Sequence, residues 1–142
     1  MTQPGNFEYI YFGDPEALVI KILTDSSEMQ ALNPTKIADN MIDYEFETDK
    51  WVEVGMQGGS YRYRQQKRPR IDIITYAPDR ETAYDLGATA QAVMMKYQGS
   101  GYHAFNLLYL ACQIETDLFK SIDKETGAIR YIQALRLILK AQ

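Results

Sequence analysis

The chain has 142 residues, of which 46% are hydrophobic, and this composition is typical of one folded domain and not of a disordered chain. Its formal net charge is −4 and its isoelectric point is near 5.0, which disfavours a dedicated nucleic-acid-binding protein. No apolar run approaches the roughly 18 residues of a membrane span, so we expect no membrane partner.

The charges are unevenly distributed along the chain. Residues 1–57 carry eleven acidic and three basic side chains, whereas residues 58–70 carry five basic side chains and no acidic one. Residues 71–142 are nearly balanced, with eight acids and seven bases. Such segregation suits subunits that dock an acidic surface against a basic one.

The first half of the chain predicts one helix and two strands. Residues 1–13 are expected to form a flexible arm, because Pro4, Gly5 and Gly13 interrupt regular structure. Asp14-Pro15-Glu16 is a strong helix start, and the apolar spacing that follows predicts a helix to about Thr24. An extended loop is expected over 25–42. The alternating acids of 43–49 fit either an edge strand or a solvated loop.

A hairpin is predicted next. Trp51–Met56 has the composition of a strand, and Gly58-Gly59 is interpreted as the turn that closes it. Residues 61–64 alternate tyrosine and arginine with the period of a strand. We expect a polar kink or turn with a bulge over 65–70, with Pro69 limiting strand pairing, followed by a strand over 71–76.

The second half predicts one long helix and two strands. Residues 80–98 have an alanine-rich apolar stripe, and Gly87 within it suggests a close contact with a sheet. Residues 104–115 predict a strand and 117–127 a loop. Residues 129–140 fit a helix or a strand, and we favour a strand because it follows a strand and a hairpin-like loop.

These elements predict an α+β fold. The expected sheet is antiparallel or mixed, has about four to five strands and carries two main helices packed on one face. The predicted organisation is a flexible arm over 1–13 and a single domain over 14–142.

Residue clusters that support catalysis or metal binding are missing from the sequence. His103 is the only histidine, and Cys112 is the only cysteine, expected to be a small buried side chain in a reducing compartment. The glycines of 55–59 lack the lysine and hydroxyl of a phosphate-binding loop. We therefore expect no enzyme activity and no cofactor or metal.

The basic segment 58–70 allows three interpretations. Its side chains fit contacts with DNA phosphates, with acids of a neighbouring subunit, or with solvent at a protected sheet edge. The last two are favoured over the first because the protein as a whole is acidic.

Several stretches together resemble the tail terminator proteins of long-tailed bacteriophages, also called tail-completion or tail-to-head joining proteins. The resemblance begins at the helix after Asp14-Pro15. It continues through Trp51–Gly59, Arg68-Pro69-Arg70-Ile71-Asp72-Ile73, Tyr76–Leu86 and Arg130–Leu137. It covers most of the chain from about residue 14 onward.

The resemblance implies a virion protein without enzyme activity, assembled in the host cytoplasm and located at the head-proximal end of the tail. Such subunits close into a ring, usually hexameric, that caps the tail tube, stops its growth and presents a surface to the head connector. Genomic DNA passes through the hole without specific binding. The implied partners are thus the chain itself, the tail tube protein and the head-tail connector protein.

We predict that oppositely charged side chains meet where two subunits of this ring touch. The predicted seam joins Arg62, Arg64, Arg68 and Arg70 to Asp43, Glu45, Glu47 and Glu53. The main alternative function is a head-completion or connector-stopper protein of the virion neck. A cytoplasmic enzyme and a nucleic-acid-binding domain are weaker alternatives.

Overall fold

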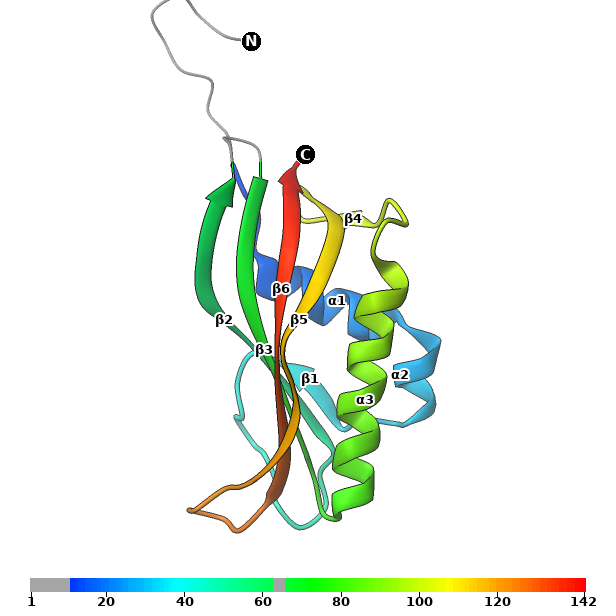
Figure 1. Cartoon of the computed structure of the whole chain (residues 1–142). Helices are drawn as coiled ribbons and strands as arrows, with labels where there is room; N and C mark the ends of the chain where they lie inside the picture. Colours follow the sequence, from blue (N-terminus) through cyan, green and yellow to red (C-terminus); the bar gives the residue numbers. More distant parts are fainter. Residues whose placement is uncertain (1–10, 63–65) are drawn as a thin grey trace, which may run out of the picture.

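The computed structural model describes residues 11–62 and 66–142, with the backbone alone over 59–62. Within them lie three helices and a six-stranded mixed sheet (Figure 1). The helices are α1 (Pro15–Asp25), α2 (Ser27–Ala31) and α3 (Arg80–Tyr97). The strands are β1 (Lys36–Ala38), β2 (Trp51–Arg62), β3 (Gln66–Ala77), β4 (His103–Ala104), β5 (Leu107–Ile122) and β6 (Ile129–Ala141).

The helices begin where the sequence supplies caps. The Oδ1 of Asp14 accepts hydrogen bonds from the backbone N–H groups of Glu16 and Ala17 at 2.9 and 3.3 Å, and Pro15 occupies the first turn of α1. Asp79 caps α3 in the same way through the N–H of Thr82 at 3.0 Å. The predicted helices at 15–24 and 80–98 are therefore confirmed to within one residue at each end.

The sheet has the strand order β1-β2-β3-β6-β5-β4, in which β1 is parallel to β2 and the other neighbours are antiparallel. The predicted mixed α+β sheet is confirmed, but it has six strands and not four to five. The additional strands are the short edge strands β1 and β4, which have three and two residues. Such short segments carry too little apolar periodicity to be recognised in a sequence.

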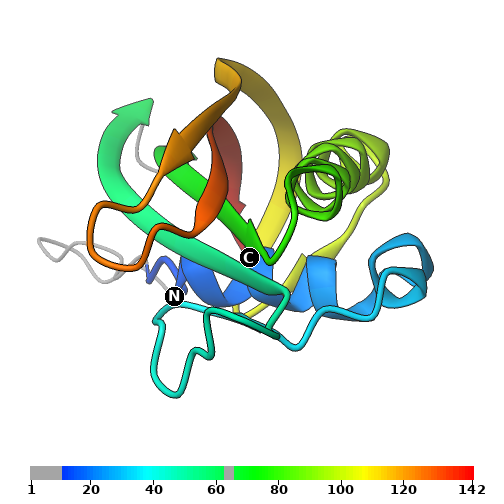
Figure 2. The same ribbon diagram turned by 90° about the horizontal axis from the view of Figure 1, so that it is seen from below.

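One face of the sheet is covered by helices, and this face holds the main core. Alternate residues of the central strands, among them Val54, Ile71, Ile73 and Leu135, are buried together with apolar residues of α1 and α3. Viewed from below, α1 and α3 lie on the same side of a strongly twisted sheet (Figure 2). Two main helices on one face, as predicted, are confirmed, and α2 adds a short third helix.

The opposite face of the sheet is called the open face here. Upper and lower refer to the orientation of Figure 1. At the lower end of the open face, a second cluster of Trp51, Tyr76 and Ala128 is buried beneath the 39–50 segment. Tyr44 of that segment packs edge-on against Trp51 at 5.7 Å between ring centroids, and the Nε1 of Trp51 donates to the carbonyl of Asn40 at 2.9 Å. None of the three helices in the described part of the chain covers the rest of the open face.

The predicted hairpin turn at Gly58-Gly59 is wrong. β2 continues to Arg62, and its pairing with β3 shifts by one residue between Met56 and Gly59, so this stretch is a β-bulge. Gly58 has a φ of 84°, a conformation that favours glycine. Over 66–70 the expected kink or turn is also wrong, since β3 begins at Gln66 and Pro69 pairs with Gly59, whereas residue 65 lies outside the described residues.

Two predicted loops differ from the structure. The 25–42 segment contains α2, capped by the Ser26 hydroxyl, and β1. The predicted loop at 117–127 begins only after Ile122, because β5 is extended by pairing with β6 across three register irregularities. The strand preferred for 129–140 is confirmed as β6, and the 43–49 segment forms turns.

No helix among residues 11–62 and 66–142 has both the length and the apolar character needed to cross a bilayer.

Candidate functional site

The pairing register places two arginines of β3, Arg68 and Arg70, on the open face beside residues of β6. Arg70 lies opposite Arg136 on β6, and Arg136 lies opposite Gln113 on β5. Arg68 lies two residues along β3 from Arg70 and therefore points to the same face. The upper part of the open face thus gathers three arginines from two adjacent strands.

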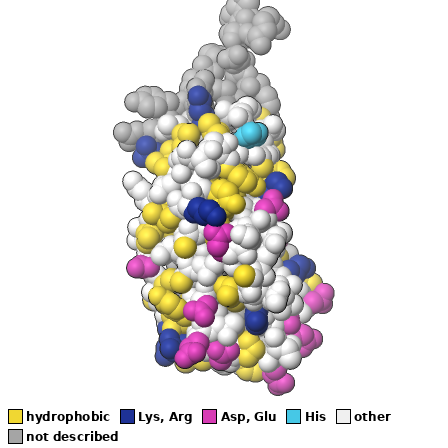
Figure 3. Space-filling view, turned by 90° about the vertical axis from the view of Figure 1, so that its right-hand side faces the viewer, with side chains coloured by type: hydrophobic (Ala, Val, Ile, Leu, Met, Phe, Trp, Pro, Cys, Tyr) yellow, Lys and Arg dark blue, Asp and Glu magenta, His cyan; other side chains and the backbone are white. Residues whose placement is uncertain are grey.

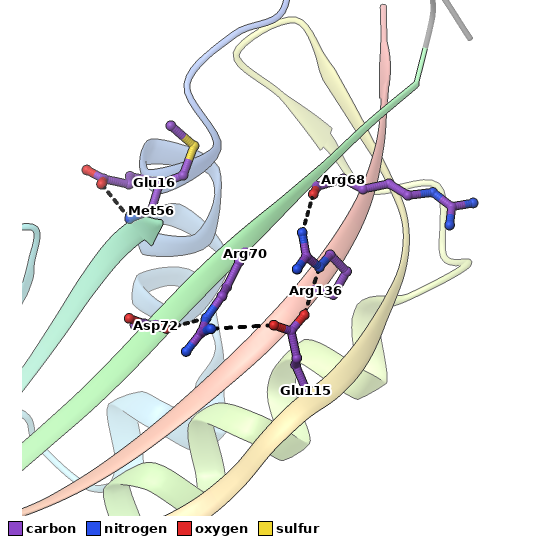
Figure 4. Close-up of polar contacts among 7 residues, drawn as sticks. All are labelled: Glu16, Met56, Arg68, Arg70, Asp72, Glu115 and Arg136. Carbon is purple, nitrogen blue, oxygen red and sulfur yellow. Dashed lines mark hydrogen bonds and ion pairs between the residues drawn. The ribbon is translucent and has the colours of Figure 1, made fainter. Parts of the chain in front are cut away.

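Two of these arginines are held by acids of the same chain (Figure 4). The Nε of Arg70 lies 3.2 Å from an Asp72 carboxylate oxygen, and its Nη1 lies 3.5 Å from Glu115 on β5. The Nε of Arg136 donates to the other Glu115 oxygen at 2.8 Å. The charges of Arg70 and Arg136 are therefore balanced within one subunit.

Arg68 is different. Its backbone carbonyl accepts a hydrogen bond from Arg136 Nη1 at 3.0 Å, but its side chain extends away from the carboxylates and across β6 toward β5 (Figure 4). Its Nε is buried and has no hydrogen-bond partner among the described residues. A buried donor without an acceptor is costly, so the Arg68 Nε is the group on this part of the open face most in need of a further acceptor.

The structure does not describe the side chains of Arg62 and Arg64, the other two arginines of the predicted seam. The backbone of Arg62 ends β2 opposite Gln66, and nothing is described of its side chain. Arg64 lies outside the described residues. Their proposed part in a subunit seam stays a prediction.

The predicted acids lie at the opposite end of the sheet. Asp43, Glu45 and Glu47 are exposed on the 39–50 segment, and none of the three carboxylates forms an ion pair or hydrogen bond with another described residue. Glu53 lies on β2, where it accepts a hydrogen bond from the Tyr76 hydroxyl at 3.2 Å. The structure therefore does not bring the arginines and the acids together within one subunit.

Sequence reasoning missed an apolar surface at the lower end of the molecule. Phe119 and Ile122 near the end of β5 are 46% and 57% exposed, and Ile42 and Phe46 of the 39–50 segment are 64% and 38% exposed. Exposed apolar side chains of this size in one region favour a protein contact. Phe119 and Ile122 carry this signal in the sequence, within a stretch for which the sequence pattern predicts a loop.

The helix-covered side carries a shallow groove of about 500 Å³ between α2 and α3. Lys96 and Glu28 bridge it with an ion pair of 2.8 Å, which lowers the pKa of the Glu28 carboxyl to about 2. Figure 3 shows charged and hydrophobic side chains interspersed on this face, with acidic ones gathered toward the lower end. Neither a histidine nor a cysteine lines this groove.

His103 and Cys112 lie in different environments. His103 is exposed at the start of β4, with its Nδ1 3.1 Å from the carbonyl of Gly101. Cys112 is buried on β5, as predicted, and burial raises the pKa of its thiol. Among the described residues, no group of three or more His, Cys, Asp or Glu side chains is arranged to hold a metal ion.

A comparison with solved structures finds the same fold in a chain of a structure titled "Virion of native gene transfer agent (GTA) particle". The superposition has a TM-score of 0.64 and covers 89% of this chain and 95% of the other, at 15% sequence identity. No protein-family model and no curated protein matches the sequence. The shared property is therefore the fold, over almost the full length of both chains.

Proposed function

We propose that this protein is a structural component of a phage-like virion, and specifically a tail terminator that closes into a ring at the end of the tail tube. The observation that carries the proposal is the fold shared with a chain of a gene transfer agent virion particle, which spans nearly all of both chains. The sequence resemblance to tail terminator proteins supports the same assignment through the order of the strands, the arginines, and the helix start at Ala77-Pro78-Asp79-Arg80.

The surface of the subunit supports assembly as its mode of action. No helix of the described residues covers most of the open face, and in its upper part the Arg68 Nε has no hydrogen-bond partner among those residues. The lower end exposes apolar and acidic side chains on the 39–50 segment and β5. A subunit with dissimilar surfaces at its two ends suits a ring of identical copies whose contacts are heterologous.

The proposed ring would act by binding alone. One of its faces would bind the last ring of tail tube protein. The other face would not bind further tube subunits and would bind the head connector. The net charge of −4 favours a lumen through which DNA slides without adhering, since like charges repel.

Two measurements on the purified protein test this proposal. Electron microscopy should show annular particles, either free or at one end of tail tubes polymerised from the tube protein of the same virion. Added during polymerisation, the protein should shorten the tubes as its concentration rises. Tubes of unchanged length that carry no terminal particle would contradict the terminator role.

A head-completion protein of the virion neck is distinguished by its partner. It would bind DNA-filled heads and leave isolated tails bare, whereas a terminator binds tails in the absence of heads. Catalytic turnover by a protein that never associates with virion parts would contradict both.

A further inference from the structure

The three arginines of the open face are not equivalent. Arg70 and Arg136 share the carboxylate of Glu115, and Asp72 adds a second acid, so both arginines are neutralised within the subunit. Arg68 has no acidic partner among the described residues, and its Nε is shielded from water. Of the described arginine side chains on this part of the face, Arg68 is the one that lacks an anion.

The 39–50 segment presents a matching set of groups. Asp43, Glu45 and Glu47 are exposed and lack basic partners among the described residues, and Ile42 and Phe46 alternate with them. The segment is held in place from beneath, because Tyr44 packs on Trp51 and Tyr76 in the second core cluster. It therefore offers carboxylates and an aromatic side chain on a supported surface.

Arg68 and this segment cannot meet within one subunit. Arg68 pairs with Ser60 on β2, whereas the segment leads into Trp51, nine residues earlier on the same strand. At the rise of an extended strand, nine residues span about 30 Å. Any pairing between them must join two molecules.

We propose that the 39–50 segment of one copy docks on the upper open face of the next copy, where Glu45 or Glu47 binds the guanidinium of Arg68. Phe46 would pack beside it on the apolar side chain of Ile138, which is level with Arg68 on β6. The carboxylate supplies the acceptor that Arg68 lacks, and partial burial strengthens such a charged hydrogen bond. This inference rests on the proposed ring and names the residues of its seam.

The docking has a geometric consequence. Copies related by rotation about an axis parallel to the strands would keep their acidic ends level with one another, about 30 Å from their neighbours' Arg68. A closed ring with the proposed contact therefore requires the strands to run at a steep angle to the ring axis, so that the lower end of one subunit meets the upper end of the next.

Charge reversal and its rescue test the seam. Arg68→Glu, and separately Glu45→Lys with Glu47→Lys, should each weaken assembly by about tenfold or more, measured as ring formation by light scattering after size exclusion and by microscopy. The triple variant carries both changes and should recover assembly to within about threefold of the parent. Lys21→Glu makes the same change of charge on an exposed residue of α1, on the helix-covered side, and should assemble like the parent.

Circular dichroism and thermal melting establish that each variant is folded, and the acidic-segment variants change only exposed side chains. Unimpaired assembly of Arg68→Glu, or failure of the triple variant to recover, would overturn the seam while leaving a ring-forming parent intact. A parent that never assembles, with or without tail tubes, would overturn the proposed function and this inference together. Normal assembly with loss of salt-sensitive DNA binding in Arg68→Glu would show that the missing acceptor is a phosphate, and would reject the seam.

Discussion

Gln133 on β6 donates a hydrogen bond from its Nε2 to the backbone carbonyl of Gly87 in α3 at 2.8 Å, in a fully buried position. The Oε1 of Gln133 accepts a second hydrogen bond from Gln91 on the same helix at 3.1 Å. A polar side chain thus joins the central region of the sheet to the long helix, and it fixes how the helix sits along the strands.

Replacing Gln133 with leucine should lower the free energy of unfolding by about 1–3 kcal/mol, because the buried Gly87 carbonyl and the Gln91 amide lose a partner. Chemical denaturation measures the change. Gln113→Leu, an exposed position on β5, is the matched control and should stay within about 0.5 kcal/mol of the parent. Equal stability of the two variants would show that the Gln133 contacts contribute nothing.

Gly87→Ala should destabilise the protein by about 1 kcal/mol, although alanine is the better helix former. A Cβ at this position would lie 2.8 Å from Leu118 Cδ2 and 3.1 Å from Thr75 Oγ1. The Thr75 hydroxyl is fixed by its hydrogen bond to the Ala83 carbonyl at 2.8 Å, so it cannot easily yield.

The control for this prediction is the opposite exchange at an exposed site of the same helix. Ala92→Gly should cost about 1 kcal/mol through helix propensity alone. If Gly87→Ala instead raises the melting temperature, the close contact between α3 and the sheet is looser than the structure indicates.

Tyr44→Phe should leave the free energy of unfolding unchanged or raise it by up to about 1 kcal/mol. The Tyr44 hydroxyl is buried without a hydrogen-bond partner among the described residues, whereas its ring packs on Trp51 and Tyr76. Tyr44→Ala removes the ring as well and should cost about 3 kcal/mol. Hydrogen exchange of the 39–50 segment would then increase in the alanine variant only, and a destabilised phenylalanine variant would contradict the unpaired hydroxyl.

Ionisation of the buried Tyr76 should make the free energy of unfolding depend on pH in the alkaline range. Burial, followed by the nearby Glu53 carboxylate, raises the pKa of Tyr76 from 10 to about 12. The folded state thus prefers the neutral phenol, and this contribution is complete below pH 10 and is lost as the pH rises through about 12. Stability should fall over that interval.

Denaturation curves of the parent and of Tyr76→Phe between pH 9 and pH 12 check this sign. The free energy of unfolding should fall less steeply with pH in the variant. The reason is that the variant lacks one of the tyrosines whose pKa is higher in the folded than in the unfolded state. Tyr109→Phe should act in the same direction, since burial raises the pKa of the Tyr109 hydroxyl, which donates to the Met94 carbonyl at 2.7 Å. Parallel slopes in all three proteins would contradict the raised pKa values.

The elements that sequence patterns predicted well are those with local signals. Asp14-Pro15 and Asp79 place helix starts through caps, and the β-branched run of 71–76 predicts the centre of β3. The candidate site was predicted only as two charged segments. Three facts depend on pairing between β3, β6 and β5: the separation of these segments along the sheet, the neutralisation of Arg70 by Asp72 and Glu115, and the lack of a partner for the Arg68 Nε among the described residues.

The failures share a physical cause. Gly58 was interpreted as a turn because glycine favours a positive φ, but a positive φ also suits a bulge, and the choice depends on what lies opposite in β3. β5 extends through polar residues to Ile122 because β6 supplies its hydrogen bonds.

The sequence by itself determined the class of fold, the helix limits and the segregation of charge, since these follow from composition, spacing and caps within a few residues of one another. Only the tertiary structure decided which of the described open-face arginines has no acid among the described residues, and at which end of the sheet the carboxylates lie. Those facts arise from strand register, which places residues distant in sequence on one face and sets the distances between them.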